Sequence, residues 1–309
     1  MILKHDNTYK IGVFWSFASA FLWSTTFVSA RYLMKDGAID AVSLSLIRFV
    51  LGGGILFVLG VVFFRKKLFS VNLKDLFQLA LLGLFGIVGM SVFLFVGQKD
   101  TTAINSSMIM QINPVIILLG GLFIGEKIRP IQVLGIFMSL IGCMFVVDVI
   151  TLRGFAYKPD HMRGDLFVLL AAICWAIYSV WGKKVVKRVG GYAATTWAML
   201  LGAVELLILR LVLPMEFNLP DSAFHWSVIL YLAAFPTAVA FFAWYEAMDK
   251  IELSLLNVMQ YLTPVFTIVL AWLILSEQFS LMNAFGVLLV VAGVVFTVER
   301  KKRKLAPDV

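Results

Sequence analysis

Apolar runs of about 20 residues recur along the whole chain, and each is long enough to cross the hydrocarbon core of a bilayer. Hydrophobic residues make up 61% of the 309 residues and charged residues only 14%. Soluble domains have roughly 45–50% apolar and 25% charged residues. We therefore expect an all-α polytopic membrane protein with ten transmembrane helices: Ile11 to Tyr32, Ala41 to Phe64, Asp75 to Val96, Ala103 to Ile124, Ile131 to Val149, Asp165 to Trp181, Ala193 to Leu213, Trp226 to Met248, Leu253 to Leu275 and Leu281 to Val298.

The basic residues predict how these helices are oriented. The first apolar run is longer than the core of a cleaved signal peptide, about 7 to 15 residues, so we expect it to stay as a helix. With both termini in the cytoplasm, Lys and Arg in the connecting segments favour the inside by roughly three to one. The sequence thus predicts a multi-pass protein of the cell membrane with both termini cytoplasmic. The net charge of +8 then reflects topology, and we expect no nucleic-acid partner.

The two halves of the chain repeat one pattern at an offset of about 150 residues, on either side of a polar break from Ile150 to Gly164. We expect two repeats, at residues 11–149 and 164–299. Because each has five helices, the second must enter the membrane inverted, which is typical of secondary transporters. The matching positions are Trp23 with Trp175, Gly86 with Pro236, Pro114 with Pro264, Glu126 with Glu277, and Gly135 and Gly142 with Gly286 and Gly293.

These features together resemble the EamA family of the drug/metabolite transporter superfamily. The resemblance covers nearly the whole chain and includes the Trp in the first helix of each half, Arg48-Phe49 in the second helix, and Gly125-Glu126 before a Gly-rich fifth helix. It implies a ten-helix fold with a central cavity walled mainly by helices 1, 3, 4, 6, 8 and 9. It also implies export of small metabolites such as amino acids.

Proline and glycine interrupt four of the predicted helices near their middles. A proline removes a backbone hydrogen bond, and a helix in the membrane tolerates this where neighbouring groups replace the bond. Such breaks act either as hinges that let half-helices move around a central site or as static kinks. The candidate hinges are Gly86, Pro114, Pro236 and Pro264.

Polar and aromatic side chains near these breaks are candidates for substrate contact. Gln111 and Asn113 are about 200° apart around a helix, so they would divide between a cavity and helix packing. Asn257 and Gln260 share a face. Buried amides also join helices by hydrogen bonds, which is the alternative role. An apolar cavity with a few polar groups suits an amphiphilic cargo such as a hydrophobic or aromatic amino acid. The predicted substrate-binding residues are Trp23, Gln111, Asn113, Trp175, Tyr178, Asn257, Gln260 and Tyr261.

Few charged residues fall inside the predicted helices. Glu205, near the middle of the seventh, is a candidate for proton coupling, with a structural hydrogen bond as the alternative. Arg48 has a long side chain that can reach the interface. It could stabilise packing or attract anions, and of these two roles we expect packing. We expect no cationic side chain at the cavity, which disfavours a nucleotide-sugar carrier and favours neutral or zwitterionic cargo.

The sequence offers no catalytic constellation. Its three histidines, His5, His161 and His225, lie in predicted loops or termini, and no HExxH or GxSxG motif is present. We expect no enzyme activity, no metal and no cofactor. The predicted function is export of neutral or zwitterionic amino acids by alternating access, by a monomer or weak homodimer. The alternatives are a drug or toxic-metabolite exporter and a membrane receptor or scaffold that transports nothing.

Overall fold

The computed structural model describes residues 2–35, 37, 39–101, 106–107, 109–113, 115–117, 120, 130–146, 150–151, 154–155, 162–212, 219–275 and 281–303. These residues are almost entirely helical. The exception is a short antiparallel pairing of β1 (Ile150–Thr151) with β2 (Gly154–Phe155), between the two halves of the chain.

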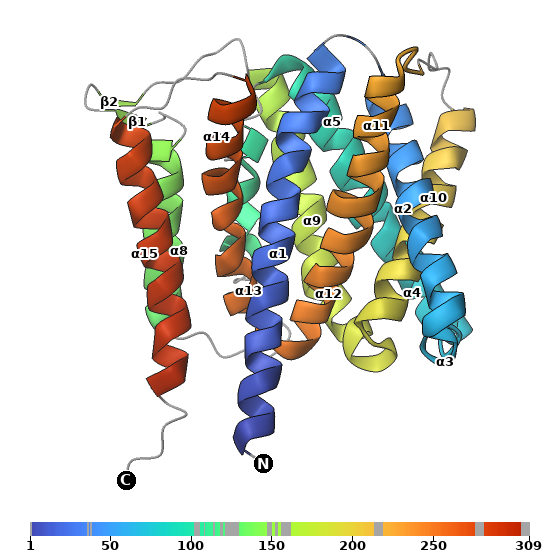
Figure 1. The fold of residues 1–309 in the computed structure, drawn as a ribbon, viewed down its shortest axis with the longest axis horizontal. Helices are drawn as coiled ribbons and strands as arrows, with labels where there is room; N and C mark the ends of the chain where they lie inside the picture. Colours follow the sequence, from blue (N-terminus) through green and yellow to red (C-terminus); the bar gives the residue numbers. More distant parts are fainter. Residues whose placement is uncertain are drawn as a thin grey trace.

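The helices follow the apolar runs closely (Figure 1). The first half contains α1 (Ile2–Lys35), α2 (Ala41–Phe63), α3 (Arg65–Leu68), α4 (Leu73–Gly83), the π-helix η1 (Leu84–Gly89), α5 (Met90–Asp100), the 3₁₀-helix η2 (Met110–Ile112) and α8 (Pro130–Val146). The second half contains α9 (Met162–Val189), α10 (Gly191–Val212), α11 (Ala223–Leu232), the π-helix η4 (Ala233–Val239), α12 (Ala240–Lys250), α13 (Leu253–Gln260), α14 (Leu262–Leu275) and α15 (Leu281–Arg303).

Seven helical stretches in the described residues are long and apolar enough to cross a membrane, and two shorter apolar helices accompany them. Half of the predicted fourth helix, 103–124, lies outside the described residues, so the expected ten helices are not all observed. The seven are Asn7–Met34, Ala41–Phe63, Leu73–Asp100, Met162–Val189, Gly191–Val212, Ala223–Lys250 and Leu255–Ile274; the shorter two are Pro130–Gly142 and Ala284–Val295.

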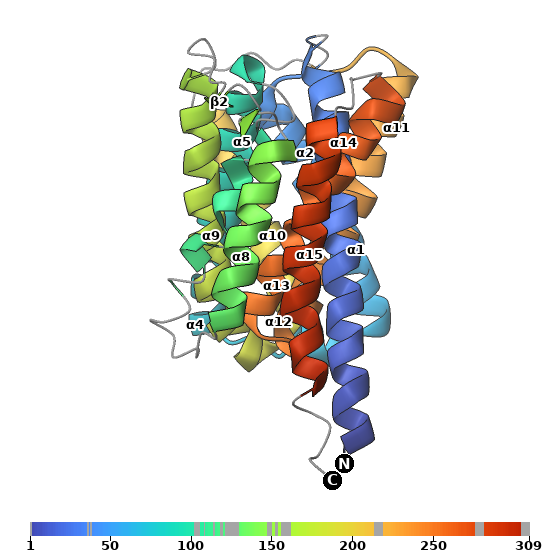
Figure 2. The ribbon, with the colours of Figure 1, turned by 90° about the vertical axis from the view of Figure 1, so that its left-hand side faces the viewer.

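The helices stand side by side as a bundle, with α8 and α15 paired at one edge (Figures 1 and 2). The start of α1 and the end of α15 lie at the same end of the bundle, and β1 and β2 lie at the other (Figure 1). Large apolar side chains such as Phe14, Val62 and Leu288 are exposed on the outside, which suits contact with lipid.

Repeated glycines bring α8 and α15 together. A Cβ atom on Gly142 would lie 2.7 Å from the carbonyl oxygen of Gly286, and one on Gly293 would lie 2.6 Å from that of Gly135. Small residues at such positions let helix backbones approach closely in a membrane. The glycine pairs that match between the two halves of the sequence are therefore the contact surface of two equivalent helices.

The third and eighth helices are interrupted at equivalent places. Gly86 lies in η1 and Pro236 lies in η4. Because Pro236 has no N–H, the carbonyl of Leu232 loses its usual α-helical partner. The Thr237 hydroxyl donates to that carbonyl instead, at 2.7 Å. Both predicted breaks are present as π-helices; their action as hinges stays a prediction.

The ninth helix is divided as well. α13 ends at Gln260, Tyr261 forms a turn, and α14 begins at Leu262, so Pro264 lies in the first turn of α14. A first-turn N–H has no partner inside its own helix, so proline is accommodated there. The predicted break is thus a division into two helices. Pro114, its counterpart, lies outside the described residues.

Candidate functional site

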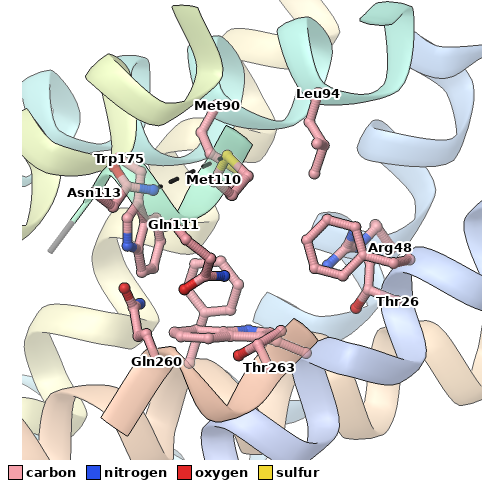
Figure 3. Close-up of a pocket in the computed structure, with 13 residues that line it drawn as sticks. Thr26, Arg48, Met90, Leu94, Met110, Gln111, Asn113, Trp175, Gln260 and Thr263 are labelled. Atoms are coloured by element: carbon pink, nitrogen blue, oxygen red, sulfur yellow. Dashed lines mark hydrogen bonds between the residues drawn. The ribbon is translucent and has the colours of Figure 1, made fainter. Parts of the chain in front are cut away.

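A cavity with about 560 Å³ of empty space, counting its open mouth, lies among helices of both halves (Figure 3). Side chains from α1, α2, α5, η2, α9, α12, α13 and α14 line it, together with Asn113. The lining residues are Trp23, Thr26, Phe27, Arg48, Met90, Leu94, Met110, Gln111, Asn113, Trp175, Phe241, Gln260 and Thr263.

Two tryptophans that match between the halves meet beside this cavity. The rings of Trp23 and Trp175 contact edge to face with centroids 5.1 Å apart. Phe241 lies 5.6 Å from each of them, and Trp244 lies 5.3 Å from Trp23 and 5.6 Å from Trp175. We call Trp23, Trp175, Phe241 and Trp244 the aromatic cluster. Edge-to-face contacts between rings at these spacings are stabilising, so the cluster forms a rigid apolar wall.

Amide side chains provide polar groups at the cavity. The Gln111 Nε2 donates to the carbonyl of Ser107 at 3.0 Å, and its Oε1 is buried without a partner in the described residues. The Asn113 Nδ2 lies 4.0 Å from the sulfur of Met110, a weak contact. Gln260 points into the cavity, near Asn113 and Trp175 (Figure 3), and its amide has no hydrogen-bond partner among the described residues. These amides can bind a cargo by hydrogen bonds.

Five of the eight predicted substrate-binding residues therefore line one cavity: Trp23, Gln111, Asn113, Trp175 and Gln260. The expected division of Gln111 and Asn113 between cavity and packing is wrong, because both line the cavity where the chain forms the 3₁₀-helix η2 in place of a regular α-helix. The other three lie outside its lining. Tyr178 covers Gly86, where a Cβ atom would lie 2.2 Å from its ring. The Asn257 side chain donates to its own helix at the carbonyl of Leu253, at 2.6 Å. Tyr261, in the turn between α13 and α14, is fully buried in a separate apolar cluster.

Arg48 corrects the expectation that no cationic side chain faces the cavity. It is 3% exposed and lines the cavity from α2. Its Nε donates to the Thr237 hydroxyl of η4 at 2.9 Å. Its guanidinium carbon lies 5.0 Å from the ring centroid of Phe49 and 5.4 Å from that of Phe95. Because Arg48 lies in the outer half of a predicted helix, the sequence suggested a side chain reaching the interface; its contact with η4 turns it inward.

Glu205 is on α10 and is not among the residues that line the cavity. Its Oε2 is buried without a hydrogen-bond partner in the described residues. The predicted coupling role therefore has no geometric link to the cavity and stays a prediction. In the described part of the chain, no group of three or more His, Cys, Asp or Glu side chains is arranged to hold a metal ion.

Gln260 and Asn257 provide a matched pair for testing the cavity, because one amide lines it and the other does not. We expect Gln260→Leu to weaken cargo binding by roughly 2- to 10-fold, the effect of one lost hydrogen bond. Asn257→Leu should leave cargo affinity unchanged. Equilibrium binding to the purified variants measures both. If the two changes weaken binding equally, Gln260 acts through helix packing alone.

Comparisons with known proteins agree with this architecture. Residues 10–148 and 162–299 each match the EamA-like transporter family. An uncharacterized transporter of Archaeoglobus fulgidus is 28% identical over 284 residues, covering 91% of this chain and 94% of that protein. The aromatic amino acid exporter YddG of Ancylobacter novellus is 26% identical over 255 residues, covering 82% of this chain and 85% of the exporter. A solved crystal structure with 23% identity has the same fold, with a TM-score of 0.77 over 97% of this chain and 99% of that one. This chain therefore belongs to the EamA-like transporter family of membrane proteins.

Proposed function

We propose that this protein exports small amphiphilic metabolites, foremost amino acids with hydrophobic or aromatic side chains, by alternating access at the cavity. The observation that carries the proposal is the cavity itself. It combines the aromatic Trp23, Trp175 and Phe241 with the amides of Gln111 and Gln260. Pockets for small molecules are mostly apolar with a few polar groups that orient the ligand.

The breaks in the helices support alternating access. Residues of α5, which follows η1, and of α12, which follows η4, line the cavity at Met90, Leu94 and Phe241. Gln260 and Thr263 lie on either side of the turn at Tyr261. In secondary transporters, discontinuous helices surround the substrate site, and one repeat moves against the other. The same arrangement here supports a role for the breaks as hinges and not only as static kinks.

The cargo class is supported by one relative and by the cavity's chemistry. YddG of Ancylobacter novellus is named as an aromatic amino acid exporter. An aromatic side chain would pack against Trp23 and Trp175, and the polar end of an amino acid would bind to cavity amides. The basic residues favour both termini in the cytoplasm of the cell membrane, so export means movement from the side that holds the termini.

Counterflow into liposomes tests the proposed function. Purified protein is reconstituted into vesicles loaded with unlabelled phenylalanine, tryptophan, leucine, lysine or glutamate, and uptake of the labelled form is followed. We expect uptake of phenylalanine, tryptophan and leucine and little uptake of lysine. Absence of counterflow for every compound would contradict the proposal and favour the receptor or scaffold alternative.

A further inference from the structure

One of the three side-chain nitrogens of Arg48, Nε, has a hydrogen-bond partner among the described residues. The Thr237 hydroxyl uses its only proton on the carbonyl of Leu232, at 2.7 Å. It can therefore only accept from the Arg48 Nε, at 2.9 Å. The two terminal nitrogens of Arg48 have no hydrogen-bond partner among the described residues, and the side chain lines the cavity. Figure 3 shows Arg48 beside Thr26, across the cavity from Gln260 and Asn113.

The Arg48 guanidinium forms no ion pair with any residue that the structure describes. Among the described residues that line the cavity, none is Asp or Glu. A buried cation without a counter-charge is costly inside a membrane protein. The faces of Phe49 and Phe95 compensate part of that cost by cation–π attraction. The remaining donors favour an anion that enters the cavity.

We propose that Arg48 binds the carboxylate of the cargo, and that the carboxylate rather than the ammonium group is what the cavity recognises. This inference rests on the proposed transport function. A guanidinium offers two parallel N–H donors that match the two oxygens of a carboxylate. No described carboxylate is present in the cavity to pair with an ammonium group; the groups facing Arg48 are neutral amides. The cargo class is therefore amphiphilic carboxylates, with amino acids as one kind.

The simpler role for Arg48 is to join α2 to η4 through Thr237. That role accounts for Nε and leaves the two terminal nitrogens without a described partner in a side chain that lines the cavity. The two roles predict different ligand selectivity. A structural arginine affects all ligands alike, whereas a carboxylate-binding arginine affects only those that carry a carboxylate.

Three related compounds separate these roles on the unaltered protein. Binding of phenylalanine, 3-phenylpropionate and phenylalaninamide to purified protein is measured by competition against labelled phenylalanine. The first has both charged groups, the second lacks the ammonium and the third lacks the carboxylate. We expect 3-phenylpropionate to bind within about tenfold of phenylalanine. Phenylalaninamide should bind about 10- to 100-fold more weakly than phenylalanine, the effect of losing a hydrogen-bonded ion pair.

Variants of Arg48 test whether this residue causes the selectivity for a carboxylate. Arg48→Gln should weaken binding of phenylalanine and 3-phenylpropionate about 10- to 100-fold and leave the weak binding of phenylalaninamide unchanged. Arg48→Lys keeps the positive charge but lacks the two parallel N–H donors of a guanidinium, so it should give an intermediate loss of affinity. Arg31→Gln is the matched control, because Arg31 donates to the carbonyls of Gln98 and Thr101, away from the cavity lining.

The outcomes distinguish this inference from the proposed function. Equal affinity of the unaltered protein for phenylalanine and phenylalaninamide would overturn the role of Arg48 and leave transport standing. An equal loss for all three compounds in Arg48→Gln would show a purely structural arginine. If none of the three binds the unaltered protein, the proposed cargo is wrong and carboxylate recognition falls with it. Should Arg48→Gln fail to fold, Arg48→Lys tests the role of Arg48, and the comparison of compounds on the unaltered protein tests carboxylate recognition.

Discussion

Replacing Gly86 with alanine is expected to destabilise the protein and strongly reduce transport. A Cβ atom at this position would lie 2.2 Å from Cδ2 and 2.3 Å from Cγ of the Tyr178 ring. That ring is fully buried and contacts Trp175, Phe241 and Tyr245, with centroids 5.2, 6.5 and 5.5 Å away, so it has little room to move. We expect a loss of about 1–3 kcal/mol in the free energy of unfolding, the usual effect of overpacking. Displacing the Tyr178 ring would also displace the ring of Trp175, which contacts it and lines the cavity. Thermal unfolding of the purified variant and counterflow in liposomes measure the two effects.

Gly54 is the matched control for Gly86. It lies in α2, and a Cβ atom there would meet nothing within 4 Å. Alanine at this position should leave transport unchanged and raise stability slightly, because alanine favours the helix by roughly 0.5–1 kcal/mol over glycine. If Gly86→Ala behaves like Gly54→Ala in both measurements, the close contact of Tyr178 with η1 is not needed for function.

Truncation of Trp175 to alanine is expected to have the second large effect. Its ring contacts Trp23, Tyr178, Phe241 and Trp244, and it is only 3% exposed. Lipid is as apolar as this core, so the cost comes mainly from the cavity left behind and amounts to roughly 3 kcal/mol. Cargo binding should fall as well, because an aromatic wall of the cavity is removed.

Trp272 is the matched control for Trp175, since it is 54% exposed on α14. We expect Trp272→Ala to change unfolding and cargo binding little. Trp175→Phe should recover part of both losses because it restores an aromatic ring. If the Trp175→Ala protein binds cargo with unaltered affinity, the aromatic cluster does not contribute to the cargo site.

The sequence predicted the described helices and the breaks at Gly86, Pro236 and Pro264, while the break at Pro114 lies outside the described residues. Gly86 lacks a side chain and Pro236 lacks a backbone N–H. Both properties weaken an α-helix locally, whatever the surrounding fold. The offset of about 150 residues also paired Trp23 with Trp175, which the structure brings into contact. Local backbone chemistry and internal repetition therefore indicated both the breaks and one wall of the cavity.

The direction of individual side chains could not be predicted in the same way. Asn257 and Gln260 share a helical face, yet Asn257 is one turn further from the cavity and bonds within α13. Arg48 turns inward because its partner, Thr237, lies on a helix 189 residues away in sequence. Because Pro236 has no N–H, the carbonyl of Leu232 accepts the proton of the Thr237 hydroxyl, and the hydroxyl oxygen can then accept from Arg48. Contacts between distant segments decide such positions, and no local pattern contains them.

Accessibility of the cavity from the two sides of the membrane tests alternating access most directly. Thr263 lines the cavity and is replaced by cysteine in a chain whose natural residues Cys143 and Cys174 are changed to alanine. A membrane-impermeant maleimide is added to one side of reconstituted vesicles at a time, with and without phenylalanine. We predict labelling of Thr263→Cys from either side and a marked reduction by phenylalanine. Labelling from one side only under all conditions, unaffected by cargo, would contradict alternating access at this cavity.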